Sequence, residues 1–349
     1  IGAVDVSRYI DSPYCRQDIT LETKEFKANS GLYNIDDIIT MSPQMEEIKQ
    51  RIPLIADTDS SVLIYGETGT GKELVAESIH TASKRAGKRF VSQNCAAIPG
   101  NLLESILFGT KKGSYTGAEN KPGLFEIANG GTLFLDEINS MELNVQAKIL
   151  KAIEEKQVVR LGGYEPIKTD IKVISAVNER PMDCVKAGKL REDLFYRLSV
   201  VQVNIPPLRE RRDDILYMTN RFIETYNQSM RRDIMGLDEQ VEKLFRNYAW
   251  PGNVRELQNA IEYAMNMMPA SGILYSELLH GRFHKQHTSD TDCSEILNDN
   301  WTLDEMEAAM IRRCLEHFSG QKDEKRLAAQ KLGIGLATLY RKMKKYNLT

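Results

Sequence analysis

The sequence predicts an α/β protein with a parallel-sheet core, a small helical domain after it, and a separate all-α helix-turn-helix domain at the end. Three observations support this fold class. Short apolar runs alternate with amphipathic helical patterns between residues 35 and 207. Strand patterns then stop, and helical patterns follow one another up to residue 281. A basic segment with two short helical patterns ends the chain. Strands that alternate with helices are typical of a parallel sheet covered by helices.

Length and composition indicate a multidomain soluble protein. The 349 residues exceed what one hydrophobic core usually supports, and the formal net charge is only -3. No apolar run approaches the roughly 18 residues of a membrane-spanning helix, and the start has no signal-peptide pattern. We therefore expect a cytoplasmic protein without a membrane partner. The five cysteines are scattered, which indicates reduced thiols rather than a zinc site or disulfide framework.

Changes in composition divide the chain into five parts. Residues 1–34 are expected to be the end of an N-terminal regulatory domain, resembling the last strand of a PAS sensor, and a linker. Residues 35–207 form the α/β core and residues 208–281 the helical domain. The polar, aperiodic residues 282–300 favour a linker, and residues 301–349 form the last helical unit.

A glycine-rich loop directly follows a predicted strand and opens a predicted helix. Its sequence GETGTGKE fits the phosphate-loop pattern G-x-x-x-x-G-K, with the residues Gly66, Glu67, Thr68, Gly69, Thr70, Gly71, Lys72 and Glu73. The backbone N–H groups of such a loop surround phosphates, and Lys72 reaches the β- and γ-phosphates of ATP. Glu73 stands where many such loops have the Ser or Thr that binds magnesium, so that ligand must come from elsewhere. The alternative is a glycine turn before a surface helix.

Two carboxylates end the apolar strand GGTLFLDE. We expect Asp136 to hold Mg²⁺ directly or through water, and Glu137 to polarise the water that attacks ATP. The alternative is a strand capped by acidic turn residues. The phosphate loop elsewhere in the same predicted core favours the catalytic interpretation.

From about residue 35 onward the sequence resembles the sigma-54-dependent transcriptional activators, or bacterial enhancer-binding proteins. The segment GSYTGA resembles the GAFTGA loop with which that family contacts the sigma factor; its residues are Gly113, Ser114, Tyr115, Thr116, Gly117 and Ala118. Several glycines interrupt a helical pattern here, which by itself indicates an exposed functional loop, with a structural loop as the alternative. Tyr115 keeps an aromatic ring where the family has Phe. The resemblance also implies a second loop at residues 158–170.

The resemblance implies an AAA+ ATPase core with a helical lid, and it assigns roles to further residues. Asn94 corresponds to the asparagine that restrains the catalytic glutamate, and Asn178 to the amide called sensor I. Arg191 and Arg197, in LREDLFYRL, correspond to arginine fingers that complete a neighbouring subunit's site. Arg255, in WPGNVREL, corresponds to sensor II. The alternatives are strand-end caps for the asparagines, surface ion pairs for the first two arginines, and an ordinary helix-start residue for Arg255.

The last unit concentrates positive charge. Residues 322–349 contain eight Lys or Arg and two acidic residues, a net charge of +6 in an otherwise acidic chain. Binding to the phosphate backbone of DNA requires such a charge, and two helical patterns joined at residues 333–335 predict a helix-turn-helix. The resemblance implies a Fis-like domain that pairs through residues 303–318. Its recognition helix would begin near Leu336 and contact DNA through Ala337, Thr338, Arg341 and Lys342. A solvated basic helical hairpin is the alternative.

Together these features predict an ATP-dependent activator of sigma-54 RNA polymerase. It would bind upstream DNA, assemble from dimers to a hexameric ring, and remodel the closed promoter complex through the GSYTGA loop. Two other functions are open at this point: a different AAA+ machine, such as an unfoldase or helicase, and a repressor for which ATP is only a structural ligand.

Overall fold

The structure is a computed structural model, and it describes residues 31–114, 118–275 and 323–346 together with residues 307, 308, 310–312, 314, 315 and 318. The expectations for residues 1–30, for residues 115–117 of the GSYTGA loop and for the linker 282–300 lie outside these residues. Contacts divide the chain after Leu274 into two units, each described by itself.

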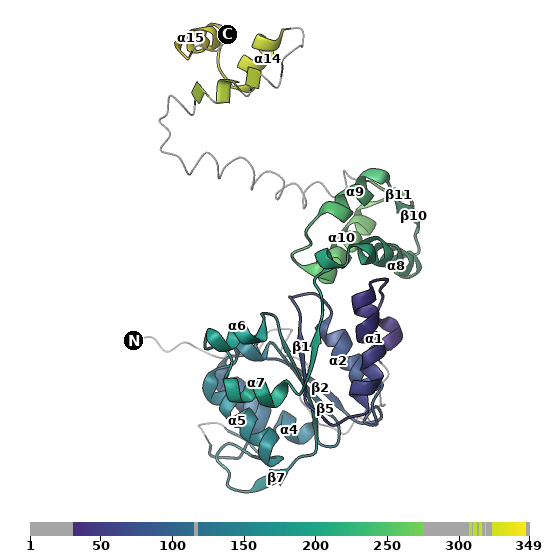
Figure 1. Ribbon diagram of the computed structural model, residues 1–349, viewed down its shortest axis with the longest axis vertical. Coiled ribbons are helices and arrows are strands. Elements are labelled where there is room, and N and C mark those ends of the chain that lie inside the picture. Colours follow the sequence, from purple (N-terminus) through teal and green to yellow (C-terminus); the bar gives the residue numbers. More distant parts are fainter. Residues whose placement is uncertain are drawn as a thin grey trace. The chain divides into compact units, whose positions relative to one another are not determined.

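The first unit is built on a five-stranded sheet in which all neighbouring strands are parallel (Figure 1). The strand order is β2-β5-β8-β1-β9, with β1 at Val62–Tyr65, β2 at Phe90–Asn94, β5 at Thr132–Asp136, β8 at Lys172–Val177 and β9 at Val201–Asn204. Because the strands are parallel, their carboxyl ends lie at one edge of the sheet, where ligands bind in such folds. The predicted parallel α/β core is confirmed.

Helices cover both faces of this sheet (Figure 1). Side chains that alternate along β1 enter two different cores: Leu63 packs in one, and Val62 and Ile64 pack in the other. The Leu63 core is completed by α3 (Gly100–Phe108), α4 (Leu124–Ile127), α5 (Leu143–Glu155), α6 (Pro181–Lys186) and α7 (Glu192–Leu198). The other core is completed by α1 (Pro43–Ala56) and α2 (Lys72–Thr81). Burial on both faces explains why the strands read as continuous apolar runs.

Short elements lie at the margins of the sheet. Two hairpins project from it, β3 (Gly109–Thr110) with β4 (Lys121–Pro122) and β6 (Gln157–Val159) with β7 (Pro166–Lys168). The described residues also form the short 3-10 helices η2 (Ile35–Asp37), η3 (Ile138–Ser140) and η4 (Leu208–Glu210).

The part that follows the sheet is mostly helical. It contains α8 (Arg212–Met230), α9 (Glu239–Asn247) and α10 (Asn253–Met267). The expectation that strands are absent here is wrong, because β10 (Asp233–Leu237) and β11 (Ser271–Leu274) pair in parallel. Both strands are very short, both contain a glycine, and their register shifts between Ile234 and Leu237, so no alternating pattern marks them in the sequence.

The second unit contains the predicted helix-turn-helix. Helix α14 (Glu324–Lys331) is followed by a turn and by α15 (Leu336–Lys345), and Gly333 in the turn has φ 68°, in the left-handed region that favours glycine. The two helices share a small core of Ala328, Ala329, Leu339 and Met343 with Ile311 from the preceding segment. None of the helices in the described part of the chain is long and apolar enough to cross a membrane.

Candidate functional site

The predicted phosphate loop connects the carboxyl end of β1 to the first residue of α2. Gly69 and Gly71 have φ of 80° and 101°, a conformation that other residues rarely adopt. Lys72 is buried, and its Nζ donates to the carbonyl oxygens of Gly66 (2.9 Å) and Glu67 (3.3 Å). The hydroxyl of Thr70 donates to the Glu67 carbonyl at 2.7 Å. The side chain of Lys72 is therefore hydrogen-bonded to the backbone of its own loop.

The two predicted carboxylates lie next to this lysine. Asp136 ends β5, and Glu137 leaves the strand with φ 53° and ψ 46°. Burial lowers the pKa of Lys72, while the negative charges of Asp136 and Glu137 act in the opposite direction. Because this Coulombic effect requires proximity, the fold brings together the lysine and the carboxylate pair, which are more than sixty positions apart in the sequence.

The two predicted amides bond to the segment around these carboxylates. The Nδ2 of Asn94, opposite Asp136 in the β2–β5 register, donates to Asp136 Oδ2 at 3.3 Å. The hydrogen-bond partner of Asn94 is thus Asp136, and not the adjacent Glu137 that the resemblance implies. Asn178 follows β8, and its Oδ1 accepts a bond of 3.1 Å from Asn139 Nδ2 in η3. No sequence pattern marked Asn139, whose buried Oδ1 has no hydrogen-bond partner among the described residues.

The backbone of the helical part is hydrogen-bonded to the backbone of the phosphate loop. The N–H of Arg255 donates to the carbonyl of Gly69 at 3.3 Å, and the charge of Arg255 contributes to lowering the pKa of Lys72. A Cβ on Gly69 would lie 2.3 Å from the carbonyl oxygen of Gly252, so only glycine permits this approach. Arg255 therefore lies near the phosphate loop, where the sensor II prediction needs it.

Two further residues, which no sequence pattern marked as part of the site, hold the helical part against the loop. Asn253 is fully buried with φ 52°; its Nδ2 donates to the Thr68 carbonyl at 3.0 Å, and its Oδ1 accepts from the N–H of Leu208 at 2.8 Å. Arg209 donates to both carboxylate oxygens of Glu67, at 2.6 and 2.7 Å. Hydrogen bonding to Arg209 lowers the pKa of Glu67. The pattern WPGN marks a helix start but does not reveal these distant partners.

The two predicted arginine fingers bond to groups close to α7. Arg191 donates to both oxygens of Asp193, at 3.0 and 2.7 Å, beside a pocket of about 520 Å³ that is also lined by Glu192 and Tyr196. Arg197 donates to the carbonyl of Ile153 at 3.4 Å. Within one chain, Arg191 thus takes part in the surface ion pair that was the alternative interpretation.

The GSYTGA loop lies in the β3–β4 hairpin, and the second predicted loop lies in the β6–β7 hairpin. Of the six residues of the GSYTGA loop, the structure describes Gly113, Ser114 and Ala118. The two hairpins are bonded to each other, because Lys111 N–H donates to the Leu161 carbonyl and Leu161 N–H to the Gly109 carbonyl, both at 3.0 Å. A Cβ on Gly162 would lie 2.7 Å from the Cβ of Ser114.

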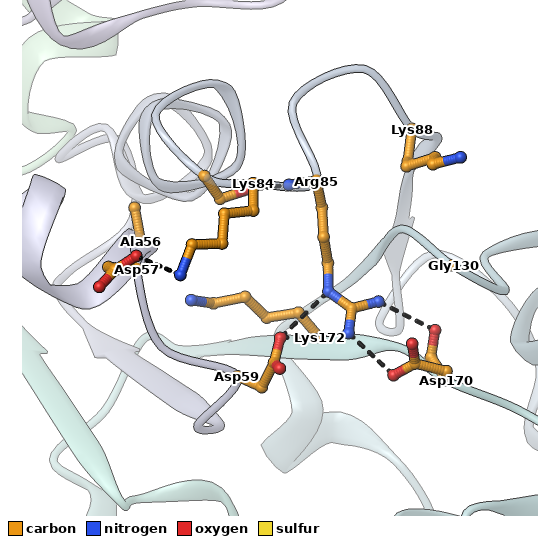
Figure 2. Close-up of a pocket in the computed structure, with 10 residues that line it drawn as sticks. Ala56, Asp57, Asp59, Lys84, Arg85, Lys88, Gly130, Asp170 and Lys172 are labelled. Atoms are coloured by element: carbon orange, nitrogen blue, oxygen red, sulfur yellow. Dashed lines mark hydrogen bonds and ion pairs between the residues drawn. The ribbon is translucent and has the colours of Figure 1, made fainter.

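A separate pocket of about 300 Å³ lies at the opposite, amino-terminal edge of the sheet (Figure 2). Its cationic side chains are largely matched within the protein: Lys84 pairs with Asp57 at 2.7 Å, and Arg85 pairs with Asp59 and Asp170 at 3.1 and 2.8 Å. Lys172 bonds to backbone carbonyls. Lys84, Arg85 and Lys172 are therefore all bonded within the protein.

The residues predicted to contact DNA lie on α15. Ala337 and Arg341 are exposed, whereas Thr338 and Lys342 are half-buried. Lys342 forms an ion pair with Glu307, and the hydroxyl of Tyr346 donates to the same carboxylate at 2.6 Å. Arg341 is therefore better exposed than Lys342 for contact with a partner.

The fold and the site together define the class of the protein. A parallel sheet with a strand–phosphate-loop–helix unit, two carboxylates at the end of β5 and a helical part that contacts the loop are the features of an AAA+ ATPase. Three family models agree with this class: "Sigma-54 interaction domain" matches residues 38–204, "AAA+ ATPase lid domain" residues 209–295, and "Bacterial regulatory protein, Fis family" residues 302–346.

The chain belongs to the sigma-54-dependent transcriptional activators, as its curated relatives also show. It is 42% identical to the transcriptional activator RocR of Bacillus subtilis over 99% of this chain and 75% of the relative. It is 38% identical to the transcriptional regulator NtrC of Escherichia coli over 89% of this chain and 70% of the relative. It is 43% identical to the regulator UacR of Escherichia coli over 90% of this chain, but it spans only 54% of that relative's length.

Solved structures agree with this assignment. The structure of NtrX from Brucella abortus in complex with ATP has a TM-score of 0.65 and 30% sequence identity, and the match covers 92% of this chain and 70% of that one. Membership of this family decides among the three functions left open by the sequence in favour of a transcriptional activator with an AAA+ ATPase and a helix-turn-helix DNA-binding domain.

Proposed function

We propose that this activator binds ATP with Mg²⁺ at the phosphate loop, hydrolyses it within a ring of subunits, and uses the energy to remodel the closed promoter complex of sigma-54 RNA polymerase. One observation carries the proposal: Lys72 lies within electrostatic reach of Asp136, Glu137 and Arg255. The ATP complex of the related NtrX supports the choice of nucleotide. The proposed AAA+ core is residues 35–207, its lid residues 208–281, and the DNA-binding domain residues 301–349.

The residues at the end of β5 fit a magnesium ion that is shared with the nucleotide. No group of three or more His, Cys, Asp or Glu side chains that could hold a metal ion is found among the described residues, and the proposed site draws on one carboxylate, Asp136. Mg²⁺ prefers this arrangement, because it usually keeps water and phosphate oxygens beside one or two carboxylates. Asp136 would hold the ion, which neutralises phosphate charge when bound.

The other residues of the site take distinct parts in hydrolysis. Lys72 would turn from its carbonyl partners to the phosphates, and Glu137 would orient the attacking water and accept its proton. Asn94 and Asn178, bonded to residues on either side of Glu137, would position that carboxylate and report the state of the phosphate. Arg255 would couple the lid to the nucleotide.

An arginine from a neighbouring copy would complete each site. Arg191 and Arg197 are the proposed fingers, and such a residue contributes about 10³ to 10⁵ in rate. Arg191 would have to exchange Asp193 for the phosphate of the adjacent subunit. Hydrolysis would therefore depend on assembly, from dimers to a ring that we propose to be hexameric.

The two hairpins would transmit hydrolysis to the polymerase. We propose that Gly113 to Ala118 contact sigma-54, with Tyr115 supplying an aromatic surface. Arg160 at the end of β6 donates to both oxygens of Glu126 on α4, at 2.8 and 2.6 Å, so the second loop is also bonded to the helix that follows β4. Through these contacts both loops would move together.

The helix-turn-helix domain would tether the ring to upstream DNA. Ala337, Thr338, Arg341 and Lys342 are the proposed contacts, and a second copy of the domain would complete the binding unit. We propose a cytoplasmic location, because the promoter and the polymerase lie there.

Transcription in vitro from a sigma-54 promoter tests this function directly. We expect the full chain to stimulate open-complex formation with ATP but not with a non-hydrolysable analogue. The variant Glu137→Gln should bind ATP with unchanged affinity but lose hydrolysis and activation together, because the water is no longer polarised. Activation by this variant at the parent level would contradict an energy-driven mechanism and favour a binding role alone.

A further inference from the structure

A buried arginine, Arg211, lies behind the phosphate loop and has no part in the mechanism described above. It precedes α8, and its side chain is only 2% exposed. Its Nη2 donates to the carbonyl oxygen of Thr70 at 3.2 Å, its Nη1 lies 3.5 Å from Asp214, and its Nε is buried without a partner. A cation at a helix N-terminus opposes the helix dipole, so the dipole of α8 does not favour Arg211 at this position.

The bond to Thr70 controls the orientation of one peptide group in the loop. In a trans peptide the carbonyl of Thr70 and the N–H of Gly71 point in opposite directions. Holding this carbonyl toward Arg211 therefore directs the N–H of Gly71 away from it. Phosphate loops bind phosphates through backbone N–H groups, so this orientation affects the binding surface itself.

The partner of Arg211 is bonded to the segment that enters the core. Asp214 is fully buried, and its carboxylate accepts the hydroxyl of Thr40 at 2.8 Å and the N–H of Ser42 at 3.0 Å, besides the N–H of Met41. All three donors directly precede α1. Thus one buried carboxylate joins the entry segment to Arg211, and Arg211 joins it to the phosphate loop.

We propose that Arg211 is a positioning residue that sets the conformation of the phosphate loop, and that its position depends on residues 40–42 through Asp214. Displacing the entry segment would remove donors from a fully buried carboxylate, which is costly. Asp214 would then draw Arg211 toward itself and away from Thr70. A change in the chain before residue 40 would thereby alter nucleotide affinity without a contact to nucleotide. This inference rests on the proposed binding of ATP at the phosphate loop.

Four variants of the full chain test the proposal: Arg211→Met, Arg211→Lys, Thr40→Val and the control Arg212→Met. Arg212 is the adjacent arginine, it is exposed, and its replacement changes the net charge equally. The measurements are the equilibrium Kd for a fluorescent ATP analogue, the KM and kcat for ATP, and the midpoint of urea unfolding.

We expect Arg211→Met to raise Kd and KM about ten-fold or more, since a bond from a charged donor is lost, while kcat at saturation stays within about three-fold. Arg211→Lys should recover part of the affinity. Thr40→Val should raise Kd about three-fold or more, although within the described residues the Thr40 hydroxyl bonds to Asp214 and Ser42 and not to the phosphate loop. Arg212→Met should match the parent.

Parental Kd values for a folded Arg211→Met would overturn the role of Arg211. If that variant does not fold, parental affinity in both Arg211→Lys and Thr40→Val would overturn it equally. Loss of kcat with unchanged Kd would do the same. The variant Lys72→Ala separates this inference from the proposed function. If the parent does not bind the analogue, or if Lys72→Ala binds it like the parent, the proposal that ATP binds at the phosphate loop is wrong. If Lys72→Ala loses binding but the Arg211 and Thr40 variants behave like the parent, only the inference about Arg211 is wrong.

Discussion

At the scale of single residues, Lys172 shows how the fold accommodates a buried charge. The residue begins β8 and is 1% exposed, and its Nζ donates to the carbonyl oxygens of Ile55 at 2.6 Å and Thr58 at 2.5 Å. These carbonyls lie at or just after the C-terminal end of α1, where a cation is favourable. Burial nevertheless lowers the pKa of Lys172 to about 8.

This lowered pKa makes a prediction about stability and pH. In the unfolded chain the lysine titrates near its ordinary pKa of 10.5, so between about pH 8 and 10.5 the unfolded state binds more protons than the folded state. Stability from this group should therefore rise with pH in that window. From pH 7 to pH 9 we expect a gain of about 1 kcal/mol in the free energy of unfolding.

Urea unfolding of the parent and of Lys172→Met at both pH values measures this contribution. The variant should lack the gain, because its side chain does not titrate. An equal pH dependence in both proteins would mean that Lys172 does not carry the lowered pKa. Lys84→Met is a matched control, since Lys84 is an exposed lysine of the same pocket.

At the scale of elements, the two hairpins are held together by backbone bonds and by one close contact. Gly162 has φ 72°, and a side chain there would meet both the Cβ and the Cα of Ser114, at 2.7 and 2.9 Å. Since Ser114 belongs to the GSYTGA loop, the second hairpin constrains where that loop begins. The sequence indicates two loops, but it gives no sign that they touch.

The variant Gly162→Ala should separate ATP hydrolysis from transcription activation. The added Cβ must displace Ser114, while the proposed ATP site at the carboxyl ends of the strands is untouched. We expect ATPase rates within about two-fold of the parent and a loss of promoter activation of about ten-fold or more, a change of about 1.4 kcal/mol in coupling. Paired ATPase and open-complex assays on one preparation measure both effects.

Gly188→Ala is the matched control for this variant. Gly188 has nearly the same φ, 69°, but a Cβ there would meet nothing within 4 Å. Both variants thus place an alanine at a similar positive φ, and only Gly162→Ala carries the contact. Equal activation by the two variants would argue against coupling through Ser114.

At the scale of the whole molecule, the proposed site is incomplete in a single chain. The phosphate loop, the carboxylates and Arg255 come together within the first unit, whereas Arg191 is bonded to Asp193. A composite site at a subunit interface requires a closed assembly in which each copy supplies one half to each neighbour.

Mixing two inactive variants tests this composite site. Lys72→Ala should lack ATP binding, and Arg191→Ala should bind ATP but hydrolyse it very slowly. In an equimolar mixture, about one quarter of the interfaces would join an intact phosphate loop to an intact arginine. ATPase activity should therefore reappear on mixing. Two outcomes would argue against Arg191 in this role and favour Arg197. In the first, Arg191→Ala alone hydrolyses ATP at the parent rate. In the second, the mixture does not regain ATPase activity.

Much of the fold and of the site was predictable because the relevant signals are local. The phosphate loop needs eight consecutive residues, and the carboxylate pair needs two residues after one apolar strand. The parallel α/β core and the helix-turn-helix follow from periodicity over short windows. The sequence does not predict the short strands β10 and β11, because four or five residues that include a glycine show no alternation of apolar and polar side chains.

The sequence by itself therefore determined the class of protein, the family and the segments that contain the site, since each depends on neighbouring residues. Only the tertiary structure decided which distant residues meet: Glu67 with Arg209, Thr70 with Arg211 and Thr40 with Asp214 are 142, 141 and 174 positions apart. No local pattern specifies such pairs, because they arise when separate elements pack together. Burial makes the contacts of Arg211 and Asp214 obligatory, since a buried charge that loses its partner destabilises the fold.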